Sequence, residues 1–171
     1  MTVQLRQSAR TLAARTDGPA EIRDAAVRGG LARGTTVLTA RGAIAVETLV
    51  PGDRVVTRER GLVPLMAIER TTRPTCVIPA HSLGHARPER DTRVAACQHL
   101  TLRDWRVGTL FAAGTAMIPA KRLCDGRQIV AEGETELFRL VFDLPQTIYA
   151  DGLEVPTGRT EPDVIEVATD A

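Results

Sequence analysis

The feature that most constrains the fold is a series of short segments, rich in β-branched residues, that glycine and proline separate between residues 34 and 61. The segments are Thr35–Thr39, Ala43–Val46 and Arg54–Thr57. Segments of this length, bounded by Gly and Pro, are typical of β-strands joined by tight turns. Pro51 and Gly52 suit the two central positions of such a turn, because proline presets the first and glycine accepts a positive φ at the second. Glu47–Leu49 is long enough only for a single helical turn.

Further short apolar segments follow along the rest of the chain. They are Leu62–Arg70, Thr75–Pro79, Thr92–Leu102, Ala116–Pro119, Arg127–Val130, Leu137–Phe142 and Thr147–Ala150. Short strands separated by turn residues at roughly 8 to 12-residue spacing indicate an all-β domain. His81–Asp91 has no strand pattern and is predicted to be a loop. Aromatic residues make up only 3% of the chain, so the core is predicted to consist of Val, Leu, Ile and Ala.

The opening stretch also carries a long ordered motif. It runs Gly-Thr, then Thr before a turn Gly, then Val-Glu-x-Leu, then Gly-Asp-x-Val. Its positions are Gly34, Thr35, Thr39, Gly42, Val46, Glu47, Leu49, Gly52, Asp53 and Val55. A motif of this length is far more specific than a lone glycine signature. In it the chain resembles the start of the Hint (hedgehog/intein) domain, in the form met in bacterial hedgehog/intein-like proteins.

The resemblance continues to about Gly152. The segment Cys97-Gln-His-Leu-Thr-Leu resembles the family's segment around its catalytic His, and Ile118–Ile129 resembles the run that follows it. The family resemblance implies an all-β, horseshoe-like fold with β subdomains related by a pseudo-two-fold axis. An internal repetition is of the kind this implies, since Leu49-x-x-Gly-x-x-Val-Val recurs as Leu123-x-x-Gly-x-x-Ile-Val.

The chain of 171 residues has the length of one domain with a real core. We expect a weakly ordered lead-in at residues 1–29, with a short helix at about Ala20–Arg28, then the Hint domain at 30–158. An acidic, mobile tail is expected at 159–171.

Net charge and cysteine content limit the kinds of partner and of cellular compartment that we expect for this chain. The net charge of +1, with Arg scattered among Asp and Glu, gives no electrostatic case for nucleic acid or an acidic membrane, so an Arg-driven nucleic-acid binder is a weak alternative. No segment has the length or character of a membrane span or a secretory leader. Three cysteines without a paired framework favour a reducing, cytoplasmic compartment. We expect a monomer that binds a protein partner and no cofactor.

The resemblance implies a specific chemistry. In Hint domains the side chain of the first residue, Cys or sometimes Ser, attacks the preceding carbonyl, which moves the acyl group from nitrogen to sulfur or oxygen. A His, preceded three positions earlier by a Thr, donates a proton to the departing nitrogen. Counting back from Gly34-Thr35 through the family's Cys-x-x-x-Gly-Thr places the nucleophile at Gly30. Glycine has no side chain, and the neighbours Gly29 and Leu31 offer no substitute.

Of the other two positions that this chemistry uses, one keeps the family residue and the other does not. The His is present as His99, a vestigial donor, whereas Ala96 stands where the family has its Thr. A structural, hydrogen-bonded role is the preferred interpretation of His99. Cys97 alternates with His99, so on one strand the two would share a face. Residues two apart on a strand are about 7 Å apart, too far for direct proton transfer, and a structural thiol is the preferred interpretation of Cys97. We expect Gly30 and His99 to lie close together.

The predicted function is therefore a degenerate Hint domain that does not cleave itself and acts as a binding or scaffold module. The alternative is an active autoproteolytic Hint domain that performs an N–S or N–O acyl shift, or hydrolysis, with a non-standard nucleophile. Cys97, or a water aided by His99, would be that nucleophile.

A metal site is the remaining chemical option. Cys76, His81 and His85, with Cys97 and His99 further on, supply thiol and imidazole groups that zinc prefers. Their spacing matches no established zinc pattern, and both His81 and His85 fall in the polar loop. We therefore predict no metal.

Overall fold

The computed structural model describes residues 29–103, 105–110, 114–159 and 163–167. The expected lead-in, apart from Gly29, and its short helix lie outside these residues. The strands are β1 (Leu31–Ala32), β2 (Thr36–Thr39), β3 (Gly42–Ala45), β4 (Arg54–Thr57), β5 (Gly61–Pro64), β6 (Ala67–Ile78), β7 (Thr92–Ala95), β8 (His99–Leu102), β9 (Thr115–Pro119), β10 (Val130–Val141), β11 (Thr147–Ala150), β12 (Leu153–Pro156) and β13 (Ile165–Val167). The helices are η1 (Val46–Thr48), α3 (Trp105–Leu110) and α4 (Ala120–Leu123).

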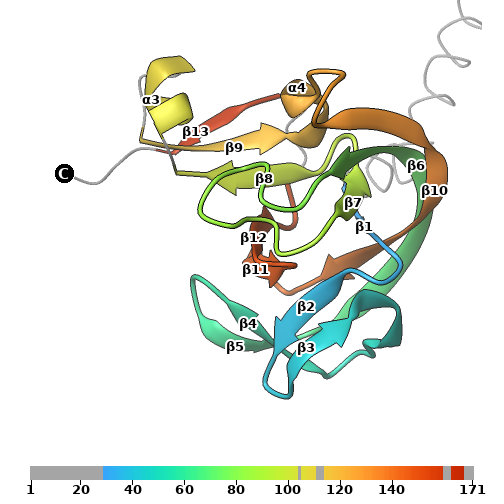
Figure 1. Cartoon of the computed structure of the whole chain (residues 1–171). Coiled ribbons are helices and arrows are strands. Elements are labelled where there is room, and N and C mark those ends of the chain that lie inside the picture. Colours follow the sequence, from blue (N-terminus) through green and yellow to red (C-terminus); the bar gives the residue numbers. More distant parts are fainter. Residues whose placement is uncertain (1–28, 104, 111–113, 160–162, 168–171) are drawn as a thin grey trace, which may run out of the picture.

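The predicted all-β class is confirmed, and the strands form three sheets. The first is a closed barrel in the order β1-β10-β6-β7. The second contains β12, β11, β2, β4 and β5 in that order, with β3 paired to β2. The third has the order β13-β9-β8. Figure 1 shows the long, curved β6 and β10 running together along one side of the molecule, with β2–β5 at one end and β8, β9 and β13 at the other.

The opening stretch folds as its sequence predicts. The three segments form β2, β3 and β4, and β2 and β3 pair as a hairpin from Thr36↔Ala45 to Thr39↔Gly42. The single helical turn appears as η1. Gly52 has a φ of 94°, the positive value that the Pro-Gly turn requires.

The strand boundaries predicted from the sequence differ from the observed ones in the region of the long strands. Leu62–Arg70 is not one strand, because the chain leaves β5 at Pro64 and re-enters a sheet at β6. Thr75–Pro79 is mostly the end of β6, which continues through Pro74. Pro74 is tolerated there because the β6–β10 register shifts between Glu132 and Glu134, opposite this residue. A β-bulge of this kind leaves room for a residue without a backbone N–H.

The internal sequence repetition corresponds to a repeated order of elements. In the first half the hairpin β2–β3 is followed by η1, by Gly52 with positive φ and by β4. In the second half the hairpin β8–β9 is followed by α4, by Gly126 with a φ of 73° and by β10. The repeated Leu-x-x-Gly-x-x-Val/Ile therefore marks the same local path twice, from a short helix through a tight turn into a strand.

The apolar positions of the predicted strands and turns place nine residues in the core, and most of them are buried. The nine are Val37, Val46, Leu49, Val55, Leu100, Leu102, Leu123, Ile129 and Val141. Those buried are Val37, Val46, Leu49, Val55, Leu100, Leu102 and Ile129. Leu123 and Val141 are half-buried, because each ends its element, α4 and β10 respectively. The largest fully buried side chain is Phe138 on β10.

A buried carboxylate joins segments that are far apart in sequence. Asp151 lies in the turn between β11 and β12 and is only 3% exposed. Its Oδ1 accepts hydrogen bonds from the backbone N–H and the hydroxyl of Thr36, at 3.0 and 2.8 Å. Its Oδ2 accepts the hydroxyl of Thr92 at 3.0 Å, and Arg90 pairs with Oδ1 at 3.1 Å. These bonds fix β2 and β7 against the β11–β12 turn.

Part of the expected acidic tail has defined structure. Ile165–Val167 forms β13, which pairs antiparallel with β9 from Ile165↔Met117 to Val167↔Thr115. Asp163 precedes the strand, and both oxygens of its carboxylate pair with Arg122, at 2.9 and 3.1 Å. None of the helices in the described residues is long and apolar enough to cross a membrane.

Candidate functional site

Gly30 lies directly before β1, inside the barrel wall. Its carbonyl accepts a hydrogen bond from the N–H of Ala95 at 2.9 Å. Its own N–H donates to the side-chain Oε1 of Gln98, also at 2.9 Å. Gly29 and Gly30 are both buried, so this junction is enclosed between β10 and the chain that leads from β7 into β8.

The backbone at Gly30 has a conformation that suits only glycine. Its φ is 136°, and a Cβ added there would lie 2.9 Å from the Cβ of Leu137. Gly29 has a φ of 92°, and a Cβ there would lie 2.3 Å from Oε1 of Gln98. Side chains with a Cβ rarely adopt these φ values. Position 30 therefore lacks both a side chain and the space for one.

Gln98 is the central polar residue of this site, and the sequence did not single it out. It is 7% exposed. Besides accepting from Gly30, its Nε2 donates to the carbonyls of His99 and Pro156, each at 2.9 Å. The sequence shows a Gln between Cys97 and His99. It does not show which backbone groups the Gln98 amide would bond, because two of these groups belong to the start of β1 and to β12.

His99 is the first residue of β8 and is 2% exposed. Its ring Nε2 lies 2.9 Å from the backbone carbonyl of Asp163, just before β13. The contacts of Gly30 reach the His99 segment through Gln98, whose side chain bonds the Gly30 N–H and the His99 carbonyl. The His99 ring nitrogen Nε2 is thus engaged with the segment that leads into β13.

Ala96 lies on the other side of Cys97 and is half-buried, packed against the main core. Its N–H donates to the carbonyl of Pro74 at 2.9 Å, and its carbonyl accepts from the N–H of Lys121 at 2.8 Å. Its backbone therefore connects β6 to the start of α4. Its methyl group supplies no hydroxyl to polarise a carbonyl.

Cys97 contacts the junction directly. The N–H of Gly29 donates to its Sγ at 3.3 Å. The side chain is half-buried and packs against a small cluster formed by Ala32, Ala95 and Leu137. A thiol is therefore present beside residue 29, although it belongs to a different element from the one where the family has its nucleophile.

The cavity at this junction is very small. Gly30, Leu31, Gln98 and Phe138 are among the residues that line about 10 Å³ of free volume. A cavity needs at least about 10–15 Å³ by this measure to hold one water molecule. The space at Gly30 is therefore at the lower limit for a single water and far below what a substrate needs.

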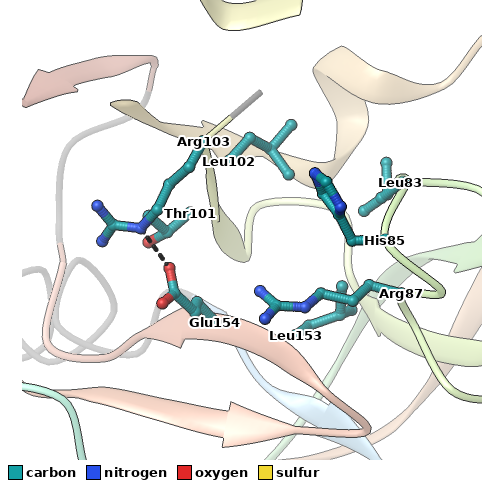
Figure 2. Close-up of a pocket in the computed structure, with 9 residues that line it drawn as sticks. Leu83, His85, Arg87, Thr101, Leu102, Arg103, Leu153 and Glu154 are labelled. Carbon is teal, nitrogen blue, oxygen red and sulfur yellow. Dashed lines mark hydrogen bonds and ion pairs between the residues drawn. The ribbon is translucent and has the colours of Figure 1, made fainter. Parts of the chain in front are cut away.

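A larger cavity lies between the loop 81–91 and strands β8 and β12 (Figure 2). Its volume is about 50 Å³. Glu154 is held there by Arg103 at 2.9 Å and by Arg58 at 3.0 Å. The Oγ1 of Thr101 is buried without a hydrogen-bond partner among the described residues. The cavity has room for small polar groups, and His85 is one of its lining residues.

The residues weighed as metal ligands are dispersed. His81 and His85 are exposed in the loop, whereas Cys76 is fully buried on β6. Within the described part of the chain, no group of three or more His, Cys, Asp or Glu side chains is arranged to hold a metal ion. Cys76 instead contacts Cys124, with 3.1 Å between the sulfur atoms.

Two solved structures with the same fold are inteins. The DnaB intein from Synechocystis sp. PCC 6803 matches at 14% identity over 77% of this chain and 99% of its own, with a TM-score of 0.51. The Ssp DnaB mini-intein variant M86 matches at 12% identity over 84% of this chain and 98% of its own, with a TM-score of 0.52. A bacterial intein-like domain from Clostridium thermocellum has 15% identity, coverage of 78% and 99%, and a TM-score of 0.49. At these identities the likeness concerns the fold.

Comparison by sequence gives the family. No curated protein matches the chain. The family model described as Hint domain matches residues 30–159, which is most of the chain and begins at the junction described above. This chain therefore belongs to the Hint domain family.

Proposed function

We propose that this protein is a degenerate Hint domain that keeps the family fold, does not cleave itself at the Gly29–Gly30 junction, and acts as a binding or scaffold module. The observation that carries the proposal is the backbone of Gly30. Its φ of 136°, and the 2.9 Å that would separate a Cβ at this position from the Cβ of Leu137, disfavour any residue with a nucleophilic side chain. The loss of the nucleophile is thus accompanied by a local structure adapted to glycine.

The energetics support the same proposal. A well-placed internal nucleophile accounts for roughly 7–11 kcal/mol of a reaction barrier, and position 30 supplies none. A proton donor alone is worth about 10²–10⁴-fold, and Nε2 of His99 already contacts the carbonyl of Asp163. The space of about 10 Å³ at the junction holds at most a single water molecule, so it does not admit an external nucleophile of larger size.

Intact mass is the direct test. Purified protein incubated for days at neutral pH, with and without dithiothreitol, is expected to keep its full mass. The appearance of a fragment that begins at Gly30 would contradict the proposal. Hydroxylamine should be included in parallel, because it traps any ester or thioester formed and converts it to a stable product.

A restoration experiment tests whether position 30 is the cause. Gly30→Cys with Ala96→Thr returns the family residues, and Leu137→Gly removes the Cβ that the new Cβ would meet. The matched control carries Gly30→Ala with the same two changes. Thiol-dependent cleavage in the first variant and none in the second would assign the lost activity to position 30. Equal cleavage in both would show that another group attacks.

One contact favours the alternative, an active autoproteolytic domain with a non-standard nucleophile. The Sγ of Cys97 lies 3.3 Å from the amide nitrogen of Gly29, so it is the thiol nearest the junction among the described contacts. If it attacks, cleavage will be thiol-dependent and will disappear in Cys97→Ala. If hydrolysis is instead aided by His99, cleavage will persist in Cys97→Ala and disappear in His99→Ala.

We propose further that the protein acts as a monomer in the cytoplasm and binds a protein partner. The net charge of +1 gives no electrostatic case for a nucleic acid or an acidic membrane as the partner, and the free thiols of Cys76, Cys97 and Cys124 fit a reducing compartment. Light scattering after size exclusion should give a single species near 18.4 kDa. A mass that doubles as the protein is concentrated would contradict the monomer.

A further inference from the structure

Two cysteines that are 48 positions apart lie in contact. Cys76 is on β6, Cys124 follows α4, and their sulfur atoms are 3.1 Å apart. A disulfide has an S–S length of about 2.05 Å, so the sulfurs need to approach by about 1 Å. Nothing in the sequence indicates this pair, because its members come from different parts of the fold and their spacing fits no motif.

The two thiols differ in access. Cys76 is fully buried, whereas Cys124 is half-buried and ends α4 in an extended conformation, with φ −66° and ψ 116°. Burial, together with the contact to Cys124, raises the pKa of the Cys76 thiol, so Cys76 stays protonated at neutral pH. Cys124, the more exposed of the two, is therefore the thiol that a reagent in solution reaches first.

The surroundings of Cys124 permit the small approach that a disulfide requires. α4 has only four residues, and the contact of Cys124 Sγ with the carbonyl of Ala120 is long, at 3.7 Å. The next residue, Asp125, is anchored, since its Oδ1 accepts the N–H groups of residues 127, 128 and 129 at 2.9, 2.8 and 3.1 Å. Cys76, in turn, is held in the barrel by pairing with Val94 and Ala131.

We propose that Cys76 and Cys124 are a modification site, a dithiol that a low-molecular-weight disulfide oxidises to an intramolecular disulfide between β6 and the turn after α4. The Cys124 thiolate attacks one sulfur of glutathione disulfide, the S–S bond breaks, and one glutathione leaves as its thiolate. Cys76 then attacks the Cys124 sulfur of the mixed disulfide while its proton passes to the departing glutathione sulfur, which releases the second glutathione as a thiol. Two protein thiols are oxidised and one disulfide is reduced to two thiols.

The third cysteine distinguishes this site from the junction. Cys97 contacts the N–H of Gly29 and takes no part in the proposed bond. The disulfide therefore forms whether or not the chain cleaves itself, and the two proposals fail independently. The new bond joins residues 48 positions apart, a length at which cross-links restrict the unfolded chain strongly.

Thiol counting and peptide mapping test the proposal on the full chain. Reduced protein should contain three titratable thiols after denaturation, and protein equilibrated with glutathione disulfide should contain one. Non-reducing digestion should give a linked peptide pair that contains Cys76 and Cys124. The oxidised form should melt several degrees higher than the reduced form, and dithiothreitol should reverse the shift.

Two variants make the result specific. Cys97→Ser should still lose both of its thiols, whereas Cys124→Ser should keep its two thiols and show no thermal shift. Cys124 is the better position to change, because its side chain is only half-buried and Cys76 is part of the core. Three free thiols after equilibration, or a cross-link that includes Cys97, would overturn the proposal.

Discussion

The backbone N–H of Gly30 and the side-chain Oε1 of Gln98 are 2.9 Å apart in a buried hydrogen bond. This bond ties the first position of the family match to the chain just before β8. The same side chain bonds the carbonyls of His99 and Pro156. Gln98 therefore connects β1, β8 and β12 at one point, and the integrity of the junction depends on it.

Gln98→Ala is expected to lower the free energy of unfolding by about 3 kcal/mol or more, because it leaves the N–H of Gly30 and the carbonyls of His99 and Pro156 without partners. Urea denaturation of both proteins measures the difference. Gln128→Ala is the control, since Gln128 is exposed and its change should stay within about 0.5 kcal/mol. Equal effects would mean that Gln98 does not make this connection.

Gly30→Ala is expected to be more costly than the same change at Gly34. Both have positive φ, but a Cβ at Gly34 meets nothing within 4 Å, whereas at Gly30 it meets Leu137. Gly34→Ala should cost about 1–2 kcal/mol from backbone strain alone. Gly30→Ala should cost about 1–3 kcal/mol more from overpacking. Thermal and urea unfolding of the Gly30→Ala and Gly34→Ala variants measures the two losses in free energy of unfolding. Similar losses would show that Leu137 moves aside freely.

His99→Ala is expected to loosen β13, because the Nε2 of His99 contacts the carbonyl of Asp163 ahead of that strand. Hydrogen exchange at residues 165–167 should speed up at least tenfold. Arg122→Ala is the matched variant, since it removes the exposed ion pair to the side chain of the same residue and should have a smaller effect. Faster exchange in Arg122→Ala than in His99→Ala would show that the ion pair of Arg122, and not the contact of His99, holds β13 in place.

Glu47 is expected to make stability depend on pH. The N–H of Gly34 donates to Glu47 Oε2 at 2.8 Å, and this bond holds the pKa of Glu47 below its usual 4.5. Because the pKa in the folded state is the lower one, the contribution is complete above the unfolded-state pKa and is lost as pH falls through the folded-state value. At neutral pH Glu47→Gln should cost about 0.5 kcal/mol, given exposure to solvent.

Unfolding measured from pH 7 down to pH 3 checks the Glu47 prediction. The difference between wild type and Glu47→Gln should shrink as the solution becomes more acidic than about pH 4.5, the ordinary value for the group. Glu134→Gln, an exposed change on β10, should show no comparable trend. A difference that grows on acidification would mean that the bond to Gly34 favours the protonated carboxyl.

Much of the fold was predictable because its signals are local. The β2–β3 hairpin, η1 and the turn at Gly52 each follow from residues within a few positions of one another. The long strands were not predictable, because Pro74 lies in β6 only by virtue of the bulge opposite it on β10. β12 and β13 were missed because both are short: Leu153–Val155 and Ile165–Val167 alternate over only three residues, and each strand depends on pairing with a neighbour, β11 and β9 respectively.

The candidate site also has features that the sequence could predict and features that it could not. Positions 30, 96 and 99 could be located from an ordered motif. The role of Gln98 and the contact between Cys76 and Cys124 could not, because each joins residues from distant parts of the chain: Gln98 bonds Gly30 and Pro156, and Cys76 is 48 positions from Cys124. The φ of Gly30 was equally hidden, since a glycine in a sequence indicates freedom but not the conformation adopted.

The pairing of β1 sets an order of events during synthesis. Leu31 pairs with Phe138 on β10 and with Val94 on β7, so the strand that follows the Gly29–Gly30 junction cannot be completed until more than a hundred further residues have been made. Contacts of such long sequence separation slow folding. The nascent chain must therefore carry Gly29 and Gly30 exposed while β2–β5 already have partners among themselves. During that interval the junction lacks the β7 and β10 partners that enclose it in the finished barrel.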